Sequence, residues 1–291
     1  MIDIHNLQAV VVWYNPSKRQ AELLWQFLNI GLHTIVVDNS EGDNAALLEA
    51  LPARQFSYLP LHHNMGIAAA LNRGCSTAQQ LGAQWVLTMD QDSQFRPDDL
   101  VRYIQQANEY SGNQEVALFS PLHNTHNFIP LALPRYSHPE TAMTSGNLLS
   151  LSVFKKLDHG FREDLFIDTV DDEYCFRAKR YGYDIVRVND IALTHPLGDI
   201  VEARCLVFSK KIHTHAPWRY YYMVRNSLRM ADLYPEQRKR LHKLLRKTLL
   251  KELKRCLFYS YPQKWKRLSF IVRGFIDYRN GVSGECPQHA A

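Results

Sequence analysis

The sequence lacks the cysteine patterns that build disulfide frameworks or zinc sites. Its five cysteines are spread along 291 residues, and no two of them form a CxxC pair. Disulfide-stapled scaffolds and structural zinc sites both need closely spaced cysteines, so neither class fits this chain. Scattered single cysteines are typical of proteins from a reducing compartment.

Long apolar segments are also missing. The first residues, MIDIHNLQAVVVWY, have neither the basic leader region nor the extended apolar stretch of a secretory signal. The longest uncharged stretch, 116–134, contains two histidines, two asparagines and three prolines, so it is unsuited to crossing a bilayer. We therefore expect a soluble cytoplasmic protein, or one attached at most to the surface of a membrane.

Two common phosphate-binding loops are absent as well. No GxxxxGK[ST] motif occurs, and no GxGxxG motif follows the first apolar run. This argues against P-loop enzymes and ordinary dehydrogenases. With 46% hydrophobic and 22% charged residues, the chain otherwise has the composition of an ordinary globular protein.

Positive charge is concentrated near the C-terminus. The chain has a net charge of +5, but residues 236–267 hold 12 Lys and Arg against two Glu, and the remainder is mildly acidic. In this region leucine recurs at every fourth position: Leu241, Leu245, Leu249, Leu253 and Leu257. Such a helix can lie on an anionic membrane or pack by its leucines onto the rest of the protein, and both alternatives stay open. Leucines without interleaved aromatics argue against a nucleic-acid partner.

Short apolar runs alternate with helical stretches in the first hundred residues. The runs occupy residues 9–14, 34–40, 56–61 and 84–93; the helical stretches are 18–30, 44–51 and 66–81, with another helix opening at Pro97. Four such β–α units predict an α/β fold with a doubly wound, mostly parallel sheet flanked by helices. Ligands of such sheets bind beyond the carboxyl ends of the strands, where the sequence places Asn15, Asp38, Asn64, Asp90 and Asp92.

The pattern changes after residue 110. Strands are expected at 115–121 and 142–151, then a loop, a helix and a strand within 163–188, and helices at 218–233, 235–260 and 265–276. We expect one domain over residues 1–233, in two halves (1–110 and 111–233), followed by a basic helical extension at 234–291.

Asp90 and Asp92 lie in one strand-end loop, in the run TMDQDS. Residues i and i+2 of an extended chain point the same way, so both carboxylates can face one ligand. Oxygen ligands of this kind suit Mg²⁺ or Mn²⁺. Ordinary turn chemistry, in which Asp and Ser bond the local backbone, is the alternative.

A second acidic cluster stands at the head of an expected helix, in FIDTVDDEYCFRAKRYGY (166–183). Asp168 and Asp171 resemble a capping box, and acids there suit the helix dipole, so a purely structural role is one interpretation. Asp171 also shares a stripe with the apolar residues three, four and seven positions on, whereas Asp172 points in another direction. A carboxylate on a core-facing stripe is costly unless it opens onto a cleft, which favours a functional role for Asp171.

Two further segments have more than one interpretation. The run NMGIAAALNRG (64–74) supplies small residues that let a helix approach either the sheet or a nucleotide closely. His195, in LTHPLGD, follows an expected strand. A lone histidine is usually structural, but this one can reach the same metal or phosphate as the two strand-end aspartates.

Eight motifs, taken in order, resemble one family. They are VVWYNP, VVDNS, NMGIAAALNRG, MDQDS, SGNLLS, LFIDTVDDEYCFRAKRYGY, HPLGD and YYYMVRN, and they span residues 9–226. The sequence resembles the family 2 glycosyltransferases of the inverting GT-A type, and most closely their bacterial rhamnosyltransferase branch. The order and spacing of these motifs are more specific than any single one.

The resemblance implies roles for individual residues. Asp38 matches the aspartate that binds the nucleoside, and Asp171 the aspartate that acts as base, although valine replaces the glutamate that commonly precedes it. Asp90 and Asp92 match the DxD pair, which with His195 would hold Mg²⁺ or Mn²⁺ on the donor diphosphate. Donor binding is implied for Tyr14, Asn15, Asp38, Asn64, Gly66, Asp90 and Arg225. Supporting roles are implied for Asp168, Asp172, Ser145, Gly146 and Asn226.

The resemblance also implies an activity. Residues 1–110 would bind the nucleotide and 111–233 the acceptor, and the enzyme would transfer L-rhamnose from dTDP-L-rhamnose to a growing bacterial surface glycan of the O-antigen or capsule type, free or lipid-linked. Two alternatives stay open: another sugar from a UDP- or GDP-linked donor, and a non-catalytic module that binds nucleotide sugars or glycans. The protein would work in the cytoplasm or on the cytoplasmic face of the inner membrane, without a nucleic-acid partner.

Overall fold

The computed structural model describes residues 1–124, 133–158, 160–195, 199–205, 208–260 and 262–286. The chain divides into two compact units. Unit 1 comprises Met1–Arg162 and Asp171–Pro196, and unit 2 comprises Glu163–Val170 and Leu197–Ala291. A short segment of unit 2 is therefore inserted into the sequence of unit 1, directly before Asp171.

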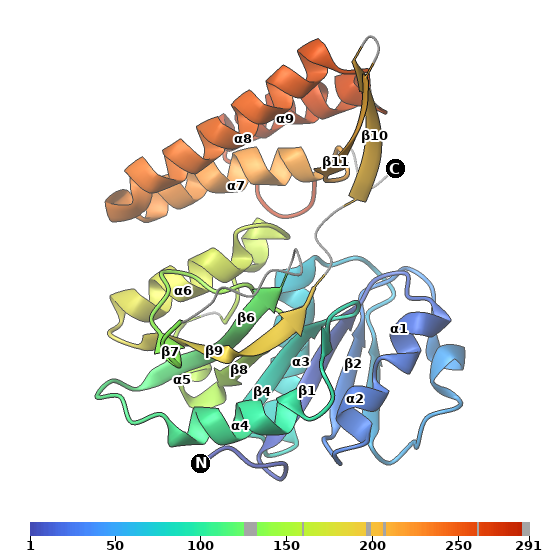
Figure 1. Ribbon diagram of the computed structural model, residues 1–291, viewed down its shortest axis with the longest axis vertical. Coiled ribbons are helices and arrows are strands. Elements are labelled where there is room, and N and C mark those ends of the chain that lie inside the picture. The colour runs from blue at the N-terminus through green and yellow to red at the C-terminus, as the bar shows by residue number, and fades with distance from the viewer. Residues whose placement is uncertain (125–132, 159, 196–198, 206–207, 261, 287–291) are drawn as a thin grey trace. The chain divides into compact units, whose positions relative to one another are not determined.

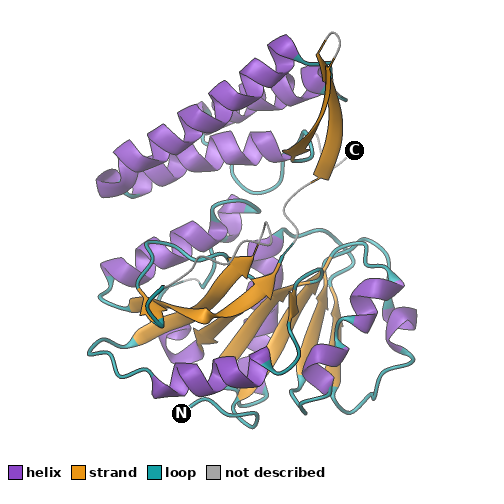
Figure 2. Ribbon diagram, in the orientation of Figure 1, coloured by secondary structure: helices purple, strands orange, loops and turns teal. Residues whose placement is uncertain are grey.

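The first half of the sheet in unit 1 follows the expected β–α alternation. Its strands are β1 (Leu7–Trp13), β2 (Thr34–Asp38), β3 (Phe56–Pro60) and β4 (Trp85–Asp90), in the spatial order β3-β2-β1-β4 (Figure 1). All neighbours in this half pair in parallel. β1 is buried along its whole length, as a strand covered on both faces should be, and helices flank the sheet (Figure 2).

Beyond β4 the sheet becomes mixed. β8 (Asn147–Ser150) runs antiparallel to both β4 and β6 (Val116–Asn124), whereas β9 (Asp184–Thr194) runs parallel to β6. The short strands β5 (Gln94–Phe95) and β7 (Tyr136–Ser137) each pair antiparallel with β9. The parallel order that the sequence predicts thus holds for the first four strands, and antiparallel β8 joins them to the rest.

Most helices of unit 1 lie where the sequence predicts them. The predicted helices are α3 (Ile67–Gln80), α4 (Asp99–Glu109) and α6 (Val170–Arg180). A further helix, α5 (Leu151–Lys156), follows β8 and was not predicted. The stretch 18–30 is divided into α1 (Lys18–Glu22) and α2 (Trp25–Leu28) rather than forming one helix. Residues 44–51 contain the 3₁₀ turn η1 (Ala45–Leu48).

The small residues of 64–74 let α3 pack closely on the sheet. A Cβ atom added to Gly74 would lie 2.3 Å from Val10 Cγ1 of β1 and 3.1 Å from Val37 Cγ2 of β2. Protein interiors have no room for such an overlap, so a side chain here would push the helix off the strands. Packing against the sheet therefore accounts for Gly74.

Unit 2 contains a hairpin and three long helices. The hairpin, β10 (Asp199–Cys205) with β11 (Phe208–Thr214), lies where the sequence predicts no strand. The helices are α7 (Arg219–Leu233), α8 (Arg238–Phe258) and α9 (Lys264–Arg279), with 3₁₀ turns η2 (Glu163–Leu165) and η3 (Pro235–Gln237). Because α7 packs against α8 and α9, the boundary between the units falls near residue 196 rather than at the expected 233.

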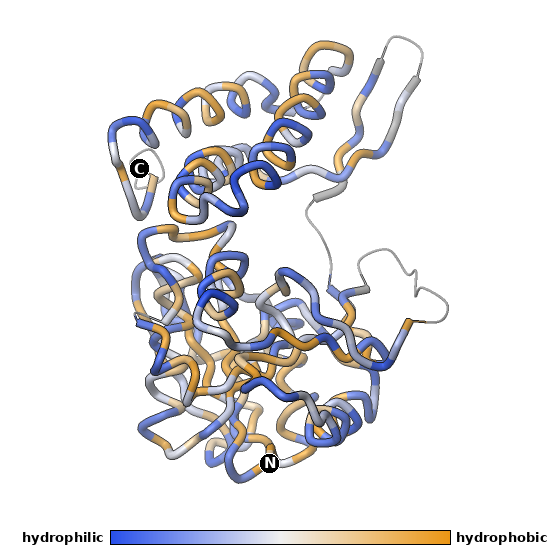
Figure 3. Tube along the Cα trace, turned by 90° about the vertical axis from the view of Figure 1, so that its left-hand side faces the viewer, coloured by the Kyte–Doolittle hydropathy of each residue, from blue (hydrophilic) through white to orange (hydrophobic). Residues whose placement is uncertain are grey.

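The leucines of α8 divide between two faces. Leu241 and Leu245 are buried, whereas Leu253 and Leu257 are 45% and 69% exposed. An α-helix turns about 100° per residue, so each step of four residues rotates the stripe by about 40°, and the last leucine points almost opposite to the first. Figure 3 shows apolar and polar residues alternating along the helices of this unit. Among the described residues, no helix combines the length and the apolar character needed to cross a bilayer.

Candidate active site

The carboxyl ends of the four parallel strands share one edge of the sheet. Tyr14 and Asn15 follow β1, Asp38 ends β2, Asn64 lies beyond β3, and Asp90 ends β4. Since β3, β2, β1 and β4 are parallel neighbours in that order, these residues lie along the same edge. That edge is where α/β sheets bind their ligands.

Hydrogen bonds connect the loops at this edge. The Tyr14 N–H donates to Gln91 Oε1 at 2.8 Å, which ties the end of β1 to the loop after β4. Asn64 Oδ1 accepts from the Asn39 side chain at 3.0 Å and from the Gly66 N–H at 3.1 Å. Gly66, with φ +84°, has the left-handed backbone that glycine adopts most easily, and α3 begins directly after it. The edge is thus a connected set of loops.

Asp38 is buried beneath its neighbours. Its Oδ2 accepts from the Tyr58 hydroxyl at 2.6 Å and from the Asn44 side chain at 2.9 Å, and its Oδ1 accepts from the Ser40 N–H at 3.2 Å. The Ser40 hydroxyl in turn accepts from the Asn15 N–H at 2.7 Å. Burial and the bond to Asp38 raise the pKa of Tyr58 far above its usual value, so the phenol remains a donor. Sequence reasoning missed Tyr58, because a tyrosine within a strand reads as an ordinary sheet residue.

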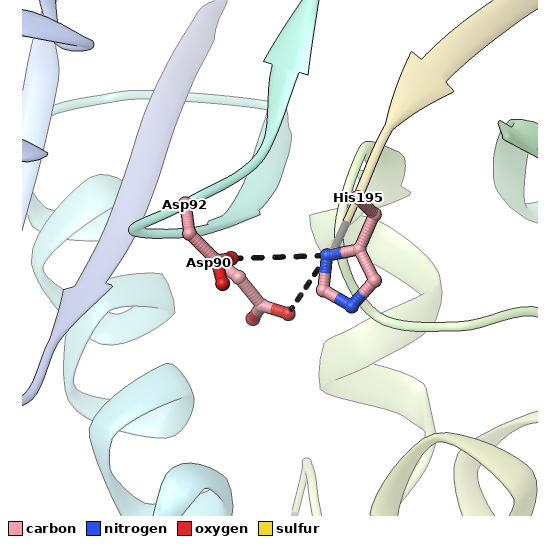
Figure 4. A group of neighbouring side chains, drawn as sticks. All are labelled: Asp90, Asp92 and His195. Carbon is pink, nitrogen blue, oxygen red and sulfur yellow. Dashed lines mark ion pairs between the residues drawn. The ribbon is translucent and has the colours of Figure 1, made fainter. Parts of the chain in front are cut away.

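Asp90, Asp92 and His195 converge beyond the ends of β4 and β9 (Figure 4). The Nδ1 atom of His195 lies 3.9 Å from Asp90 Oδ2 and 3.8 Å from Asp92 Oδ1. Gln94 of β5 pairs with Thr194 of β9, and this short antiparallel ladder carries the histidine to the aspartate loop. The structure therefore brings together the three residues that the sequence predicts as metal ligands.

Two serines connect the Asp90 loop to His195 by hydrogen bonds. The Ser145 hydroxyl accepts from the Asp90 N–H at 3.1 Å and donates to Ser93 Oγ at 2.8 Å. Ser93 Oγ lies 2.8 Å from His195 Nδ1, so the chain of bonds runs from the aspartate loop to the imidazole. Gly146 has φ +86°, and an added Cβ would lie 2.7 Å from Pro121 Cγ, so only glycine fits beside Ser145. The sequence indicated Ser145 and Gly146 as supporting residues but not Ser93, because a serine in a strand-end loop is usually explained by turn chemistry.

His123 is a further residue that sequence reasoning missed. It lies near the end of β6, its Nε2–H donates to the Ser145 carbonyl at 2.6 Å, and its ring centroid is 6.4 Å from that of His195. Burial lowers the pKa of His123 to about 4, so its ring is neutral at neutral pH. In sequence it belongs to a loop-like, proline-containing stretch, and only the β6–β9 pairing places it beside the site.

The acidic cluster of residues 168–173 begins helix α6. The stripe three, four and seven positions beyond Asp171 is buried as expected: Tyr174, Cys175 and Ala178. Asp171 and Asp172 are both half-buried, and the Asp172 N–H donates to Asp171 Oδ1 at 3.0 Å. Glu173 is the buried acid of the cluster, 1% exposed and paired with Arg177 at 2.9 Å. The structure thus assigns Glu173 to packing and leaves Asp171 and Asp172 at the helix start.

Arg225 is placed differently from the donor contact that the sequence predicts. It belongs to unit 2, its side chain is fully buried, and its five N–H donors all have partners within that unit. No donor is left over for a phosphate. Asn226 and Asp168 also belong to unit 2, where Asp168 forms an ion pair with Arg219.

Residues 9–129 of the chain match the sequence family described as Glycosyl transferase family 2. This region is similar to a family 2 glycosyl transferase domain. The protein is thus a glycosyltransferase, in agreement with the resemblance seen in its motifs. It is 29% identical over 242 residues to the dTDP-rhamnosyl transferase RfbF of Shigella flexneri, and that match covers 76% of this chain and 78% of RfbF.

Two solved structures share the fold of this glycosyltransferase. The crystal structure of S. aureus TarS 1-349 in complex with UDP-GlcNAc has a TM-score of 0.55 and 15% identity, over 95% of this chain and 81% of that one. The crystal structure of GalNAc-T7 with UDP, GalNAc and Mn²⁺ has a TM-score of 0.52 and 10% identity, over 66% of this chain and 44% of that one. At these identities the likeness shows the fold, which is of the GT-A type with a helical C-terminal part.

Asp90, Asp92 and His195 fit a divalent cation. One ligand atom from each of Asp90, Asp92 and His195 lies within 4.8 Å of the others. The two aspartate side chains are 36% and 42% exposed, so a diphosphate can approach them. Two carboxylates this close repel each other, and a cation between them would remove that repulsion. Carboxylate oxygens are ligands of Mg²⁺ and Mn²⁺.

Proposed function

We propose that this glycosyltransferase is a metal-dependent, inverting rhamnosyltransferase that uses dTDP-L-rhamnose to extend a bacterial surface glycan. The observation that carries the proposal is the convergence of Asp90, Asp92 and His195 at the ligand-binding edge of a family 2 domain. The rhamnosyl donor is supported by the similarity to a dTDP-rhamnosyl transferase over three quarters of the chain.

The strand edge is the donor side in this proposal. Asp90, Asp92 and His195 would hold Mg²⁺ or Mn²⁺, which when bound offsets the charge that develops on the departing diphosphate. Ser93 and Ser145 keep the imidazole and the aspartate loop in place through their hydrogen bonds. The loops that Asp38 organises after β1 and β2 would receive the nucleoside.

Asp171 is the base in this proposal. The acceptor hydroxyl attacks the anomeric carbon from the face opposite the diphosphate, so the new C–O bond forms as the old one breaks and the configuration inverts. The hydroxyl proton passes to the Asp171 carboxylate. Its position in the first turn of α6 suits an anion, because the helix dipole and the Asp172 N–H both stabilise negative charge there.

A panel of donors separates this proposal from its alternatives. We expect single-turnover transfer from dTDP-L-rhamnose in the presence of Mg²⁺ or Mn²⁺, and little or none from UDP-GlcNAc or GDP-mannose. Transfer from one of the other donors would retain the glycosyltransferase and replace the rhamnosyl assignment. Donor binding without transfer or hydrolysis would identify a non-catalytic module that binds nucleotide sugars.

We also propose that the exposed face of α8 contacts an anionic membrane, where a lipid-linked acceptor would be found. Leu250, Leu253 and Leu257, at helical spacings of three and four residues, are 57%, 45% and 69% exposed. Three exposed lysines of the same helix flank them: Lys247, Lys251 and Lys254. A second apolar stripe bordered by cations is the pattern of helices that lie in a membrane interface, where each basic residue contributes about 1 kcal/mol.

Liposome flotation tests the membrane contact. We expect the full chain to float with phosphatidylglycerol vesicles at low salt, and the double variant Leu253→Glu/Leu257→Glu to remain in the soluble fraction. Leu81→Glu is the matched control, because Leu81 is a 52% exposed leucine of unit 1 and should float like the wild type. Equal flotation of all three proteins, or none by the wild type, would contradict the proposal.

A further inference from the structure

The backbone directly before Asp171 has an unusual conformation. Phe166, Asp168 and Thr169 have φ values of +67°, +61° and +63°, although none of them is glycine. Left-handed backbone is unfavourable for residues with a Cβ atom, most of all for a β-branched one such as threonine. Three such residues within four positions persist only if the surrounding structure holds them.

Asn226 of α7 holds this segment by its main chain. Its side-chain NH₂ group lies within hydrogen-bond distance of three carbonyls, those of Leu165 at 2.9 Å, Ile167 at 2.7 Å and Asp168 at 3.0 Å. Asn226 itself is fully buried. One amide group therefore bonds the carbonyls on both sides of Phe166, the first left-handed residue.

Arg225 fixes the direction of the Asn226 amide. Its Nε–H donates to Asn226 Oδ1 at 2.9 Å, which turns the NH₂ group of the asparagine toward the segment. One terminal nitrogen donates to the Leu165 carbonyl at 3.0 Å and the other to the Gly284 carbonyl at 2.7 Å. The Gly284 N–H donates back to the segment at the Asp164 carbonyl, at 2.8 Å.

The same face of α7 binds the side chains of the segment. Arg219 pairs with Asp168. The Tyr222 ring stacks on Phe166, with centroids 5.3 Å apart and an interplanar angle of 11°. Arg229 Nη1 lies 3.4 Å from Asp164 Oδ2. Positions 219, 222, 226 and 229 follow the three- and four-residue spacing of one helix face, so that face is devoted to residues 164–168.

Thr169 shows a second sign of strain. Its hydroxyl oxygen is buried and has no hydrogen-bond partner among the described residues. Buried polar groups are nearly always paired, and an unpaired one on a left-handed threonine marks a conformation imposed by its surroundings. The segment therefore passes from the carbonyls held by Asn226 straight into the first turn of α6.

We propose that Asn226 and Arg225 are positioning residues for the transfer reaction: they lock residues 165–168 in the left-handed path that sets where Asp171 enters α6. The inference rests on the proposed function of Asp171 as base. It replaces the donor-phosphate contact expected of Arg225 with a role exerted through the main chain of the segment that precedes the base.

The test measures the segment and the reaction separately, on the full chain. In Asn226→Ala we expect faster hydrogen–deuterium exchange in peptides covering 164–172 and a fall in turnover of about 10²-fold, with the KM for dTDP-L-rhamnose unchanged. Tyr220→Phe is the matched control, because Tyr220 is a buried residue of the same helix that bonds Glu252 at 2.7 Å instead of the segment. This control should keep wild-type exchange in 164–172 and wild-type turnover.

Relief of the strain should rescue the variant. Asparagine adopts left-handed backbone more readily than threonine, so Thr169→Asn in the Asn226→Ala background should recover part of the lost turnover. If Asn226→Ala does not fold, Arg225→Lys replaces it, because lysine keeps the charge but has three N–H donors where Arg225 uses five. The same pattern of exchange and turnover is expected. Unchanged exchange and turnover, or losses matched by Tyr220→Phe, would overturn the inference. Normal activity of Asp171→Asn would instead refute the proposed role of Asp171 as base. The hydrogen–deuterium exchange result does not depend on that role.

Discussion

Chelation of divalent cations with EDTA should abolish sugar transfer by this glycosyltransferase, and Asp92→Ala should lower turnover by about 10²–10³-fold. Asp92 Oδ1 faces His195 Nδ1 at 3.8 Å, so losing this carboxylate removes one of the three groups that would hold the cation against the donor diphosphate. The leaving group would then depart without charge compensation. Initial rates measured with and without EDTA, and after Mn²⁺ or Mg²⁺ is restored, provide the test.

The variant should stay folded, because the Asp92 side chain is 42% exposed and its removal opens no core. Asp190→Ala is the matched control: Asp190 is an exposed acid of β9, the strand that leads to His195, and its loss should change neither melting temperature nor rate. Full activity in EDTA would contradict the metal assignment and return the aspartate pair to turn chemistry.

Asp171→Asn should reduce turnover by about 10²–10⁴-fold, the range that a positioned general base contributes. The substitution keeps the size of the side chain and the Oδ1 atom that accepts from the Asp172 N–H at 3.0 Å, so the start of α6 should be preserved. An amide cannot take the proton of the acceptor hydroxyl. Near-wild-type melting and nucleotide binding together with slow transfer is the expected result.

Asp172→Asn is the control for this prediction. Asp172 is half-buried in the same helical turn but lies about 100° further round the helix than Asp171, so its loss should have little effect. An inactive Asp172→Asn beside an active Asp171→Asn would move the base to the neighbouring acid. Activity in both variants would show that the acidic cluster only stabilises the start of α6.

The row of polar residues at the carboxyl ends of the parallel strands could be predicted from the sequence because each part of it is a local signal. A buried apolar run that ends in a polar residue marks a strand end, and four such runs separated by helices predict parallel order. These local signals are sufficient to place Asp38, Asn64 and Asp90 on one edge of the sheet. His195 was harder: its approach to Asp92 depends on the pairing of Gln94 with Thr194, and no local pattern encodes that pairing.

The roles of Arg225 and α8 show where local patterns mislead. A conspicuous Arg-Asn pair within a motif resembles a phosphate contact. Arg225 is nevertheless buried, and its five N–H donors bond three backbone carbonyls and two side chains of unit 2. A leucine at every fourth position reads as one stripe, yet the 3.6-residue turn spreads it over two faces. Leu241 is buried and Leu257 is exposed for this reason.

The sequence by itself determined the β–α alternation, the helical C-terminal part, the loop that carries Asp90 and Asp92, and the resemblance to glycosyltransferases. Each of these follows from hydrophobic periodicity or from side chains adjacent in the chain. Tertiary structure alone decided the mixed half of the sheet, the bonds of Ser93 and His123 next to Asp90 and His195, and the use of an α7 face to hold residues 164–168. Those features depend on which distant segments pair and which donors are buried, and the free energy of such contacts is set by packing between residues that lie far apart in the sequence.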